Sequence, residues 1–258
     1  MKHLVVAVSP DSSLELLGEY ADIIVLDKES IPASIPRYET LYIRSHFGQA
    51  STLPQVFRKE IEAIVQRAKQ QNPYIAFIDD TDTVEKILDT EDKWRQYKTF
   101  SEFMPNTQLF NDAADISGFE HPIFKNRFSS HGNGVTWDRE KVTPPNDEWL
   151  VQESLDIVEE LRVYVIRGEV YPVGAIRQSK TADQNTQAVD SRNLTPQEVD
   201  FSLNVGKKAI GMDIIGIDIA RTSDENLYLM EVNRSPGFGL FAQLTGINLA
   251  SNLYGEKL

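Results

Sequence analysis

The sequence predicts a mixed α/β (α+β) protein in which a small parallel α/β domain precedes a larger, strand-rich part. Two observations predict this arrangement. Up to about residue 90, short apolar runs of strand length alternate with helical stretches, which is typical of a parallel sheet. Past about residue 105, the sequence changes to strand pairs and long polar loops with one further helix. The chain of 258 residues is long enough to bury a core in each part.

The first part contains four strand-length runs rich in Val, Ile or Tyr: Leu4–Val8, Ile23–Leu26, Leu41–Ile43 and Tyr74–Ile78. Helices are predicted over Ser13–Tyr20 and over Leu53–Gln71, where apolar residues recur near helical spacing. An acidic cluster follows the last run. Because Asp82 precedes Glu85 by three positions, we interpret Asp82 as a helix N-cap rather than a metal ligand.

The second part begins with a predicted hairpin, in which Arg167-Gly168-Glu169 turns between Leu161–Ile166 and Val170–Ala175. A polar stretch from Gln178 to Asn193 predicts a loop. Thr195, Pro196 and Glu198 then supply an N-cap, a proline at the first helical position and a capping-box acid. We expect that helix to run through Ile210, followed by strands at Ile214–Ala220 and Leu227–Val232.

Composition excludes several classes of function. The chain has no Cys, which removes disulfides, thiolate metal sites and cysteine nucleophiles. A net charge of −13 argues against a chain-wide nucleic-acid or anionic-membrane footprint, since both need a basic face. No apolar run approaches the roughly 18 residues of a membrane helix. We therefore expect a cytoplasmic protein without nucleic-acid or membrane partners.

The strongest candidate site lies on the last two predicted strands. Asp218 sits inside the apolar run of the first, and Glu231 and Asn233 lie two apart on the second, so they share one face. If these strands pair antiparallel, three oxygen donors converge, as Mg²⁺ prefers. The alternative is that all three are ordinary sheet-edge polar residues, but burying Asp218 unpaired would be costly.

Weaker signals precede this set. Lys125 lies seven positions before Gly132 in a loop of small residues, and such a loop can expose N–H groups to an anion. It could equally be a simple hairpin turn. Trp149–Leu155 is a strand that ends in polar residues. Arg162 and Arg177 lie in or beside the predicted hairpin, where a solvated surface position is an equal alternative.

In this order, these residues resemble an ATP-grasp ligase, most closely the RimK-like carboxylate–amine ligases. The resemblance covers about Thr90 to the C-terminus and includes Asp92-Lys93, Gln152-Glu153, and Glu231-x-Asn233 with Ser-Pro-Gly after it. It implies an ATP-grasp fold whose two lobes clasp ATP. The implied domains are an N-terminal α/β domain at 1–88, a central lobe at 89–153 and a C-terminal lobe at 154–258.

The resemblance also implies roles. Lys93 and Lys125 would contact the phosphates, and Glu160 would contact the ribose. Asp218, Glu231 and Asn233 would carry two Mg²⁺ ions, with Mn²⁺ as an alternative. Arg177, and secondarily Arg162, would act on the acyl phosphate or the substrate carboxylate. A loop would close over the phosphates; it consists of Ser129, Ser130, His131, Gly132, Asn133, Gly134 and Val135. A strand would hold the adenine; it consists of Gln152, Glu153, Ser154 and Leu155.

The implied activity is ATP-dependent amide formation through an acyl phosphate, with an amino acid or peptide as substrate. Two alternatives stay open: a peptide maturase that forms side-chain crosslinks, and a nucleotide-binding regulatory module without turnover. The stretch from Gln178 to Asn193 lacks the basic, Gly-Gly-containing sequence expected of a glutamate-adding RimK, so the acceptor is not fixed. The sequence is compatible with a homo-oligomer.

Overall fold

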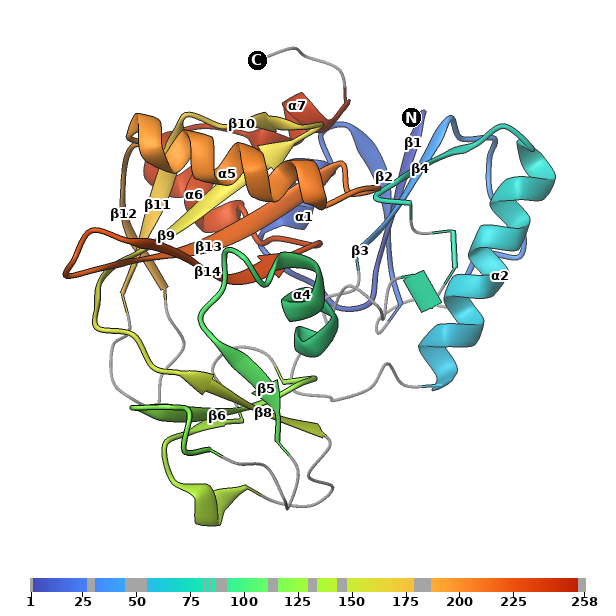
Figure 1. The fold of residues 1–258 in the computed structure, drawn as a ribbon. Helices are drawn as coiled ribbons and strands as arrows, with labels where there is room; N and C mark the ends of the chain where they lie inside the picture. Colours follow the sequence, from blue (N-terminus) through green and yellow to red (C-terminus); the bar gives the residue numbers. More distant parts are fainter. Residues whose placement is uncertain are drawn as a thin grey trace.

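The computed structural model describes residues 2–26, 31–44, 55–80, 82–83, 85–86, 92–110, 116–129, 134–142, 148–178 and 187–254. Three β-sheets organise the chain: a parallel sheet near the N-terminus, a small antiparallel sheet in the middle and a larger antiparallel sheet after it (Figure 1). No helix in the described ranges combines the length and the apolar character needed to cross a membrane.

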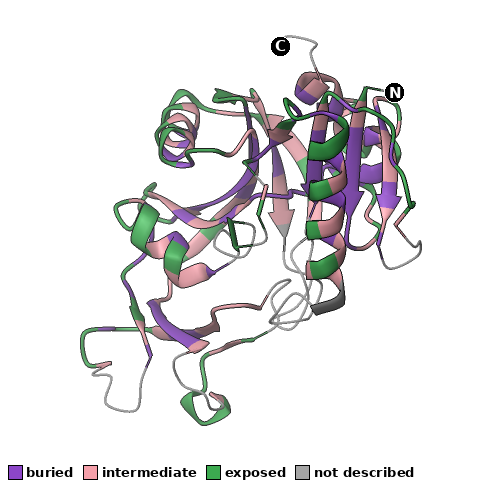
Figure 2. Ribbon diagram, turned by 90° about the vertical axis from the view of Figure 1, so that its right-hand side faces the viewer, coloured by how far each residue is buried: buried purple, intermediate pink, exposed green. Residues whose placement is uncertain are grey.

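The N-terminal sheet is parallel throughout, as predicted. Its order is β2-β1-β3-β4, with β1 (His3–Ala7), β2 (Ala21–Val25), β3 (Thr40–Arg44) and β4 (Ala76–Ile78). Strand alternation divides its side chains between two cores: Leu4 and Val6 pack toward α2 (Gln55–Gln71), and Val5 and Ala7 face the other way, with α1 (Ser13–Leu17). Both faces are therefore covered, which explains the uninterrupted apolar runs (Figure 2).

The middle sheet is small and has its own core. Its order is β5-β8-β6-β7, with β5 (Thr107–Leu109), β6 (Pro122–Asn126), β7 (Val135–Thr136) and β8 (Trp149–Glu153). The core consists mainly of aromatic side chains, including Phe110, Phe124 and Trp149. A short 3-10 helix, η1 (Arg139–Lys141), follows β7. The helix α4 (Lys93–Phe100) precedes β5 in the chain, and its Phe100 packs in the core of the C-terminal sheet.

The C-terminal sheet is antiparallel, with the order β12-β11-β9-β13-β14 and the short β10 beside β9. Its strands are β9 (Ile157–Ile166), β10 (Glu169–Val170), β11 (Val173–Gln178), β12 (Gln187–Asn193), β13 (Ile214–Thr222) and β14 (Leu227–Asn233). One face packs Leu161, Val163 and Ile217 in a core shared with α5 (Pro196–Lys208). The turn between β9 and β10 places Arg167 and Gly168 at positive φ, as a two-residue hairpin turn requires.

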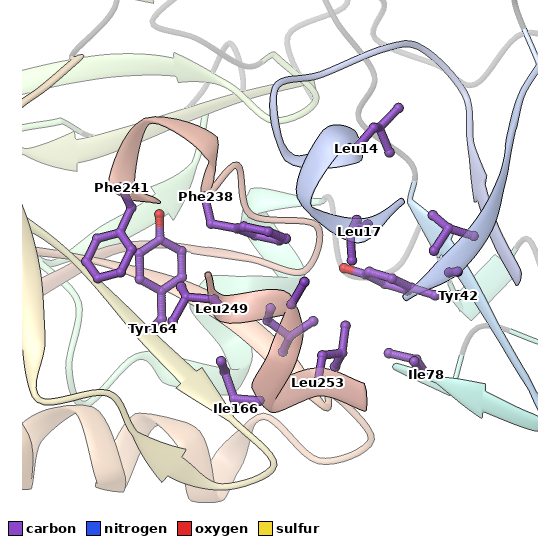
Figure 3. Packing of buried hydrophobic residues seen from close by; sticks show 14 of the residues in the cluster. Leu14, Leu17, Tyr42, Ile78, Tyr164, Ile166, Phe238, Phe241, Leu249 and Leu253 are labelled. Atoms are coloured by element: carbon purple, nitrogen blue, oxygen red, sulfur yellow. The ribbon is translucent and has the colours of Figure 1, made fainter. Parts of the chain in front are cut away.

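A shared core joins the N-terminal domain to the C-terminal sheet. Leu17 and Tyr42 on one side meet Tyr164 and Phe238 on the other (Figure 3). Two final helices, α6 (Gly239–Thr245) and α7 (Leu249–Tyr254), contribute Phe241, Leu249 and Leu253 to it. Beside this core, the buried Arg44 donates to Asp11 at 3.0 Å and to the carbonyl of Pro236 at 3.2 Å.

Three local predictions were wrong. Residues 187–193, expected to be loop, form β12, which pairs with β11. The strand shows no clear alternation of apolar residues in the sequence, and its Arg192 is held by ion pairs instead. The helix α5 ends at Lys208, and Ile210 beyond it is 89% exposed. The helix cap after β4 lies one residue later than expected: the Thr83 hydroxyl accepts the Lys86 N–H, whereas Asp82 binds the ammonium groups of Lys69 and Lys86.

Candidate functional site

One face of the C-terminal sheet is charged because of its register. Asp218 on β13 lies opposite Arg162 on β9 and opposite Glu231 on β14, and Glu160 lies opposite Arg177 on β11. Residues directly opposite each other point to the same face of a sheet. The predicted antiparallel pairing of β13 with β14 is confirmed. The sheet therefore brings together residues that are far apart in the sequence.

Asp218 is the centre of this face. Arg162 donates to both of its carboxylate oxygens, with the Nη2–Oδ2 distance at 2.7 Å, and Arg177 Nη1 lies 2.5 Å from Oδ2. Asn233 Nδ2 reaches the same oxygen at 3.4 Å. Burial opposes ionisation, but the two guanidinium groups outweigh it and lower the pKa of Asp218. Asp218 is therefore a carboxylate held by two arginines.

Glu160 lies within the same charged group. Burial raises the pKa of its carboxyl, and Arg177 acts in the opposite direction. The carboxylate of Glu160 also interacts electrostatically with Asp218 and Lys125. Glu160 therefore lies between the arginines of the C-terminal sheet and Lys125 of the middle sheet.

Two lysines face this group from the other side. Lys93, the first residue of α4, donates to the carbonyl of Ser129 and lies 3.9 Å from Glu231 Oε1. Lys125 on β6 donates to Gln152 Oε1 at 2.5 Å. Burial and the nearby Lys93 lower the pKa of Lys125 to about 8. The structure thus brings both predicted phosphate-binding lysines close to the predicted metal ligands.

The predicted adenine strand is partly engaged within the protein. The Glu153 carboxylate accepts the N–H groups of Glu120 and His121 at 3.0 and 2.7 Å, so it shapes that loop. The N–H groups of Glu153 and Ser154 donate to carbonyls of the neighbouring segments. Among the described residues, no acceptor faces the Leu155 N–H. Leu155, two residues beyond the end of β8, thus offers a backbone N–H that no acceptor among the described residues takes up.

The predicted glycine loop lies in the sequence between β6 and β7, which pair antiparallel with Lys125 opposite Val135. Gly134 has a φ of 68°, and a Cβ there would come within 2.9 Å of Asn126 Cβ and of Ser129 Oγ. Glycine is required at this close approach. Ser130, His131, Gly132 and Asn133 lie outside the described residues.

The oxygen donors of this face fit Mg²⁺, but Asp218 is already bound by arginines. Oxygen donors from Glu231, Asn233 and Asp218 share one face, and Mg²⁺ is usually held by one or two carboxylates with substrate phosphates and water. In the described ranges, no group of three or more His, Cys, Asp or Glu side chains is arranged for a metal ion. Glu231 and Asn233 would hold Mg²⁺ directly, and Asp218 could join only by exchanging an arginine contact.

Sequence reasoning missed several contacts that position this site. Asp92 caps α4 by accepting the Trp94 N–H at 2.9 Å and also pairs with Arg127, at 2.6 Å for Nη2–Oδ2. Gln96, on the same helix, bonds to the backbone of Val232 between Glu231 and Asn233. The cap was visible in the sequence. The contacts of Arg127 and Gln96 had no local signal because their partners lie far away along the chain.

Comparison with known proteins gives the same family. The RimK-like ATP-grasp domain matches residues 101–256. A probable alpha-L-glutamate ligase of Histophilus somni (strain 2336) is 25% identical over 248 residues, covering 87% of this chain and 78% of the relative. A ribosomal protein bS6--L-glutamate ligase of Escherichia coli O81 (strain ED1a) is 33% identical over 116 residues, covering 42% and 37%.

Solved structures show the same fold. The ATP-grasp ligase PsnB complexed with minimal precursor aligns with a TM-score of 0.69 at 15% identity, over 98% of this chain and 97% of that one. The D-cycloserine synthetase DcsG aligns with a TM-score of 0.65 at 12% identity, over 98% of each chain. Since the family match spans more than half of the sequence, this chain belongs to the RimK-like ATP-grasp family of ATP-dependent carboxylate–amine ligases.

Proposed function

We propose that this ATP-grasp ligase activates a substrate carboxylate as an acyl phosphate and joins it to the amine of an amino acid or peptide. A carboxylate oxygen would attack the γ-phosphorus of ATP, and ADP would leave. The amine nitrogen would then attack the acyl carbon, lose a proton and expel inorganic phosphate, leaving an amide. The family match and the two lysines beside the charged sheet face support this proposal.

The proposed division of labour follows the charges. Lys93 and Lys125 would hold the phosphates, because phosphoryl transfer needs positioning and charge neutralisation more than covalent help. Arg177 would bind the acyl phosphate or the substrate carboxylate, since its guanidinium already binds a carboxylate, that of Asp218. Arg162, which is held on both oxygens of Asp218, is the secondary candidate.

A bound divalent cation would neutralise phosphate charge in this site. ADP and Mg are named with PsnB, which shares this fold, and this supports the use of ATP and Mg²⁺ here. We propose two Mg²⁺ ions held by Glu231 and Asn233, with Asp218 contributing after it releases an arginine, and with Mn²⁺ as a substitute. Gln152 to Leu155 would hold the adenine, and the Leu155 N–H would be the main backbone donor.

Relatives suggest two classes of acceptor. The Histophilus somni and Escherichia coli proteins are named as glutamate ligases, and PsnB is named with a precursor peptide. We propose that this chain adds an amino acid to a peptide or protein. Peptide crosslinking is the second candidate; PsnB, which aligns over nearly the whole chain and is named with a precursor, supports a peptide as the substrate. We further propose a cytoplasmic location, and homo-oligomerisation remains a proposal to test by light scattering.

The single observation that carries the proposal is the convergence of Lys93 and Lys125 with Glu231, Asp218 and Arg177. ADP release should be measured with Mg²⁺ against single amino acids and then peptides, with mass spectrometry of every product. A peptide that gains one amino-acid residue indicates ligation, and a peptide that loses water without gaining a residue indicates crosslinking. ADP that binds but is never produced would favour the non-catalytic regulatory module.

A further inference from the structure

The strand that carries Glu231 and Asn233 is at the edge of its sheet. In the order β12-β11-β9-β13-β14, β14 has a strand partner on one side only. Backbone groups on the other side of an edge strand need other partners when they are buried. Val232, the residue between Glu231 and Asn233, is 3% exposed, so its N–H and C=O cannot rely on water.

Gln96 on α4 supplies both of those partners. Its Nε2 donates to the Val232 carbonyl at 2.9 Å, and its Oε1 accepts the Val232 N–H at 3.1 Å. A primary amide offers a donor and an acceptor side by side, as a neighbouring strand would. Gln96 is itself buried. One further contact covers this edge, where the Leu229 N–H donates to the Phe103 carbonyl at 2.8 Å.

The same helix carries Lys93 one turn before Gln96. Its N-terminus is held by Asp92, which caps the helix and pairs with Arg127, the residue after β6 of the middle sheet. As Figure 1 shows, α4 lies between the middle sheet and β14. Lys93 Nζ lies 3.9 Å from Glu231 Oε1. The double hydrogen bond of Gln96 therefore ties the helix that carries Lys93 to the strand that carries Glu231.

We propose that Gln96 is a positioning residue that fixes the spacing between Lys93 and the oxygen donors Glu231 and Asn233, and thereby couples nucleotide binding to Mg²⁺ binding. This inference rests on the proposed roles of those three residues. Gln96 itself has no contact with substrate in this scheme. Loss of a partner that orients a metal ligand typically weakens metal affinity by roughly 10- to 100-fold.

The test compares ADP affinity with Mg²⁺ and in EDTA, by calorimetry on the full chain. In Gln96→Met, which keeps the length but loses both hydrogen bonds, we expect the Mg²⁺-dependent gain in ADP affinity to fall by about 10-fold or more. ADP affinity in EDTA should fall by a smaller factor, because the displaced Lys93 weakens one phosphate contact while Lys125 is untouched. Lys98→Met, at an exposed position of the same helix, should match the parent.

A second control separates positioning from stability. Phe100→Leu should loosen the core of the C-terminal sheet while leaving both Gln96–Val232 hydrogen bonds in place, so it should lower the melting temperature and leave the Mg²⁺-dependent gain in ADP affinity intact. If Gln96→Met does not fold, Gln96→Asn carries the test, because it keeps the amide but withdraws it by one methylene. An unchanged Mg²⁺-dependent gain in the Gln96 variants, or an equal loss in Phe100→Leu, would overturn the inference. A parent protein without any Mg²⁺-dependent gain would overturn the proposed metal site, and the inference with it.

Discussion

At Asp218, Glu160 and Lys125, the ionisation of each group depends on its neighbours. The guanidinium groups of Arg162 and Arg177 lower the pKa of Asp218 although the carboxyl is buried, whereas burial raises that of Glu160. Lys125 is buried beside another lysine, and its pKa falls to about 8. The contribution of each ionisable side chain to this site can be measured by replacing it alone.

Replacing Glu231 tests the proposed metal contact. In Glu231→Ala we expect Mg²⁺-dependent ADP release to fall by about 100-fold or more, since charge stabilisation at the phosphates is lost. The fold should persist, because the Glu231 carboxylate is partly exposed and its ion pair with Lys93 is long, at 3.9 Å. A coupled assay for ADP and a circular-dichroism melt measure the two quantities. Glu169→Ala, on the exposed β10, is the matched control; ADP release at the parental rate in Glu231→Ala would contradict the metal assignment.

The pKa of Lys125 predicts a pH dependence of nucleotide binding. Only the protonated lysine attracts phosphate, so raising the pH through about 8 should remove that charge from the free protein. Between pH 7 and pH 9, we expect ADP affinity to fall about tenfold, since one proton is taken up on binding. Lys125→Met should bind weakly at every pH and flatten this profile, and Lys207→Met should retain it. Calorimetry across the range measures the effect, and an identical slope in Lys125→Met would exclude the assignment.

At the scale of elements, the attachment of α5 to the sheet shows what the sequence could and could not predict. The capping box of Thr195 and Glu198 is confirmed, because the motif is local and both reciprocal bonds form. No local pattern predicts that the same Glu198 carboxylate also binds Arg192 and Arg221, at 2.7 Å each. Those contacts depend on β12 and β13 lying on either side of β11 and β9, which only the folded sheet determines.

Glu198 therefore gives a prediction about stability. Its carboxylate is fully buried, and although burial opposes ionisation, the hydrogen bonds from Arg192 and Thr195 lower its pKa to about 2. Glu198→Gln would remove the carboxylate that Arg192 and Arg221 share, although each arginine keeps a second carboxylate, Glu159 or Glu225. The loss of these charge-assisted hydrogen bonds should cost about 2 kcal/mol of unfolding free energy at pH 7. Because the folded pKa is depressed, this stabilisation is present above the ordinary carboxyl pKa and is lost as the pH falls toward 2.

Urea unfolding at pH 7, 5 and 3 checks this prediction, and the difference between parent and variant should narrow at the lowest pH. Glu169→Gln, at an exposed position on β10, should unfold as the parent does at each pH. If the difference in unfolding free energy between parent and Glu198→Gln is the same at pH 3 and pH 7, the loss of the Glu198 charge does not cause it.

At the scale of the whole molecule, the sequence predicted the order of the parts but not their contacts. The parallel sheet followed from apolar runs separated by helical stretches, and it is confirmed. The charged face was only partly foreseeable: Asp218 and Glu231 were paired correctly, but the partner Arg162 lies 56 positions away on a strand that no local pattern places next to Asp218. Register between distant strands depends on tertiary packing, which a local motif does not encode.

The shared core between the N-terminal domain and the C-terminal sheet predicts joint unfolding. Asp11→Ala would leave the buried Arg44 without its carboxylate and should cost about 3 kcal/mol. Because Arg44 also holds the Pro236 carbonyl, calorimetry should show one transition at a lower temperature rather than early loss of a single domain. Glu15→Ala, at an exposed site of α1, is the control. Two separate transitions, of which only one moves, would contradict a common core.

The charged face described above has a consequence for the order in which ligands arrive. Its four cations, Lys93, Lys125, Arg162 and Arg177, nearly balance the three carboxylates of Glu160, Asp218 and Glu231, so the side chains of this face sum to almost no net charge. A nucleotide arriving alone would bring a large uncompensated negative charge into it, whereas a nucleotide accompanied by its divalent ions would not. The face therefore favours a nucleotide that arrives together with its divalent ions. When Mg²⁺ is scarce, metal-free ATP should compete poorly with Mg²⁺-bound nucleotide for this site.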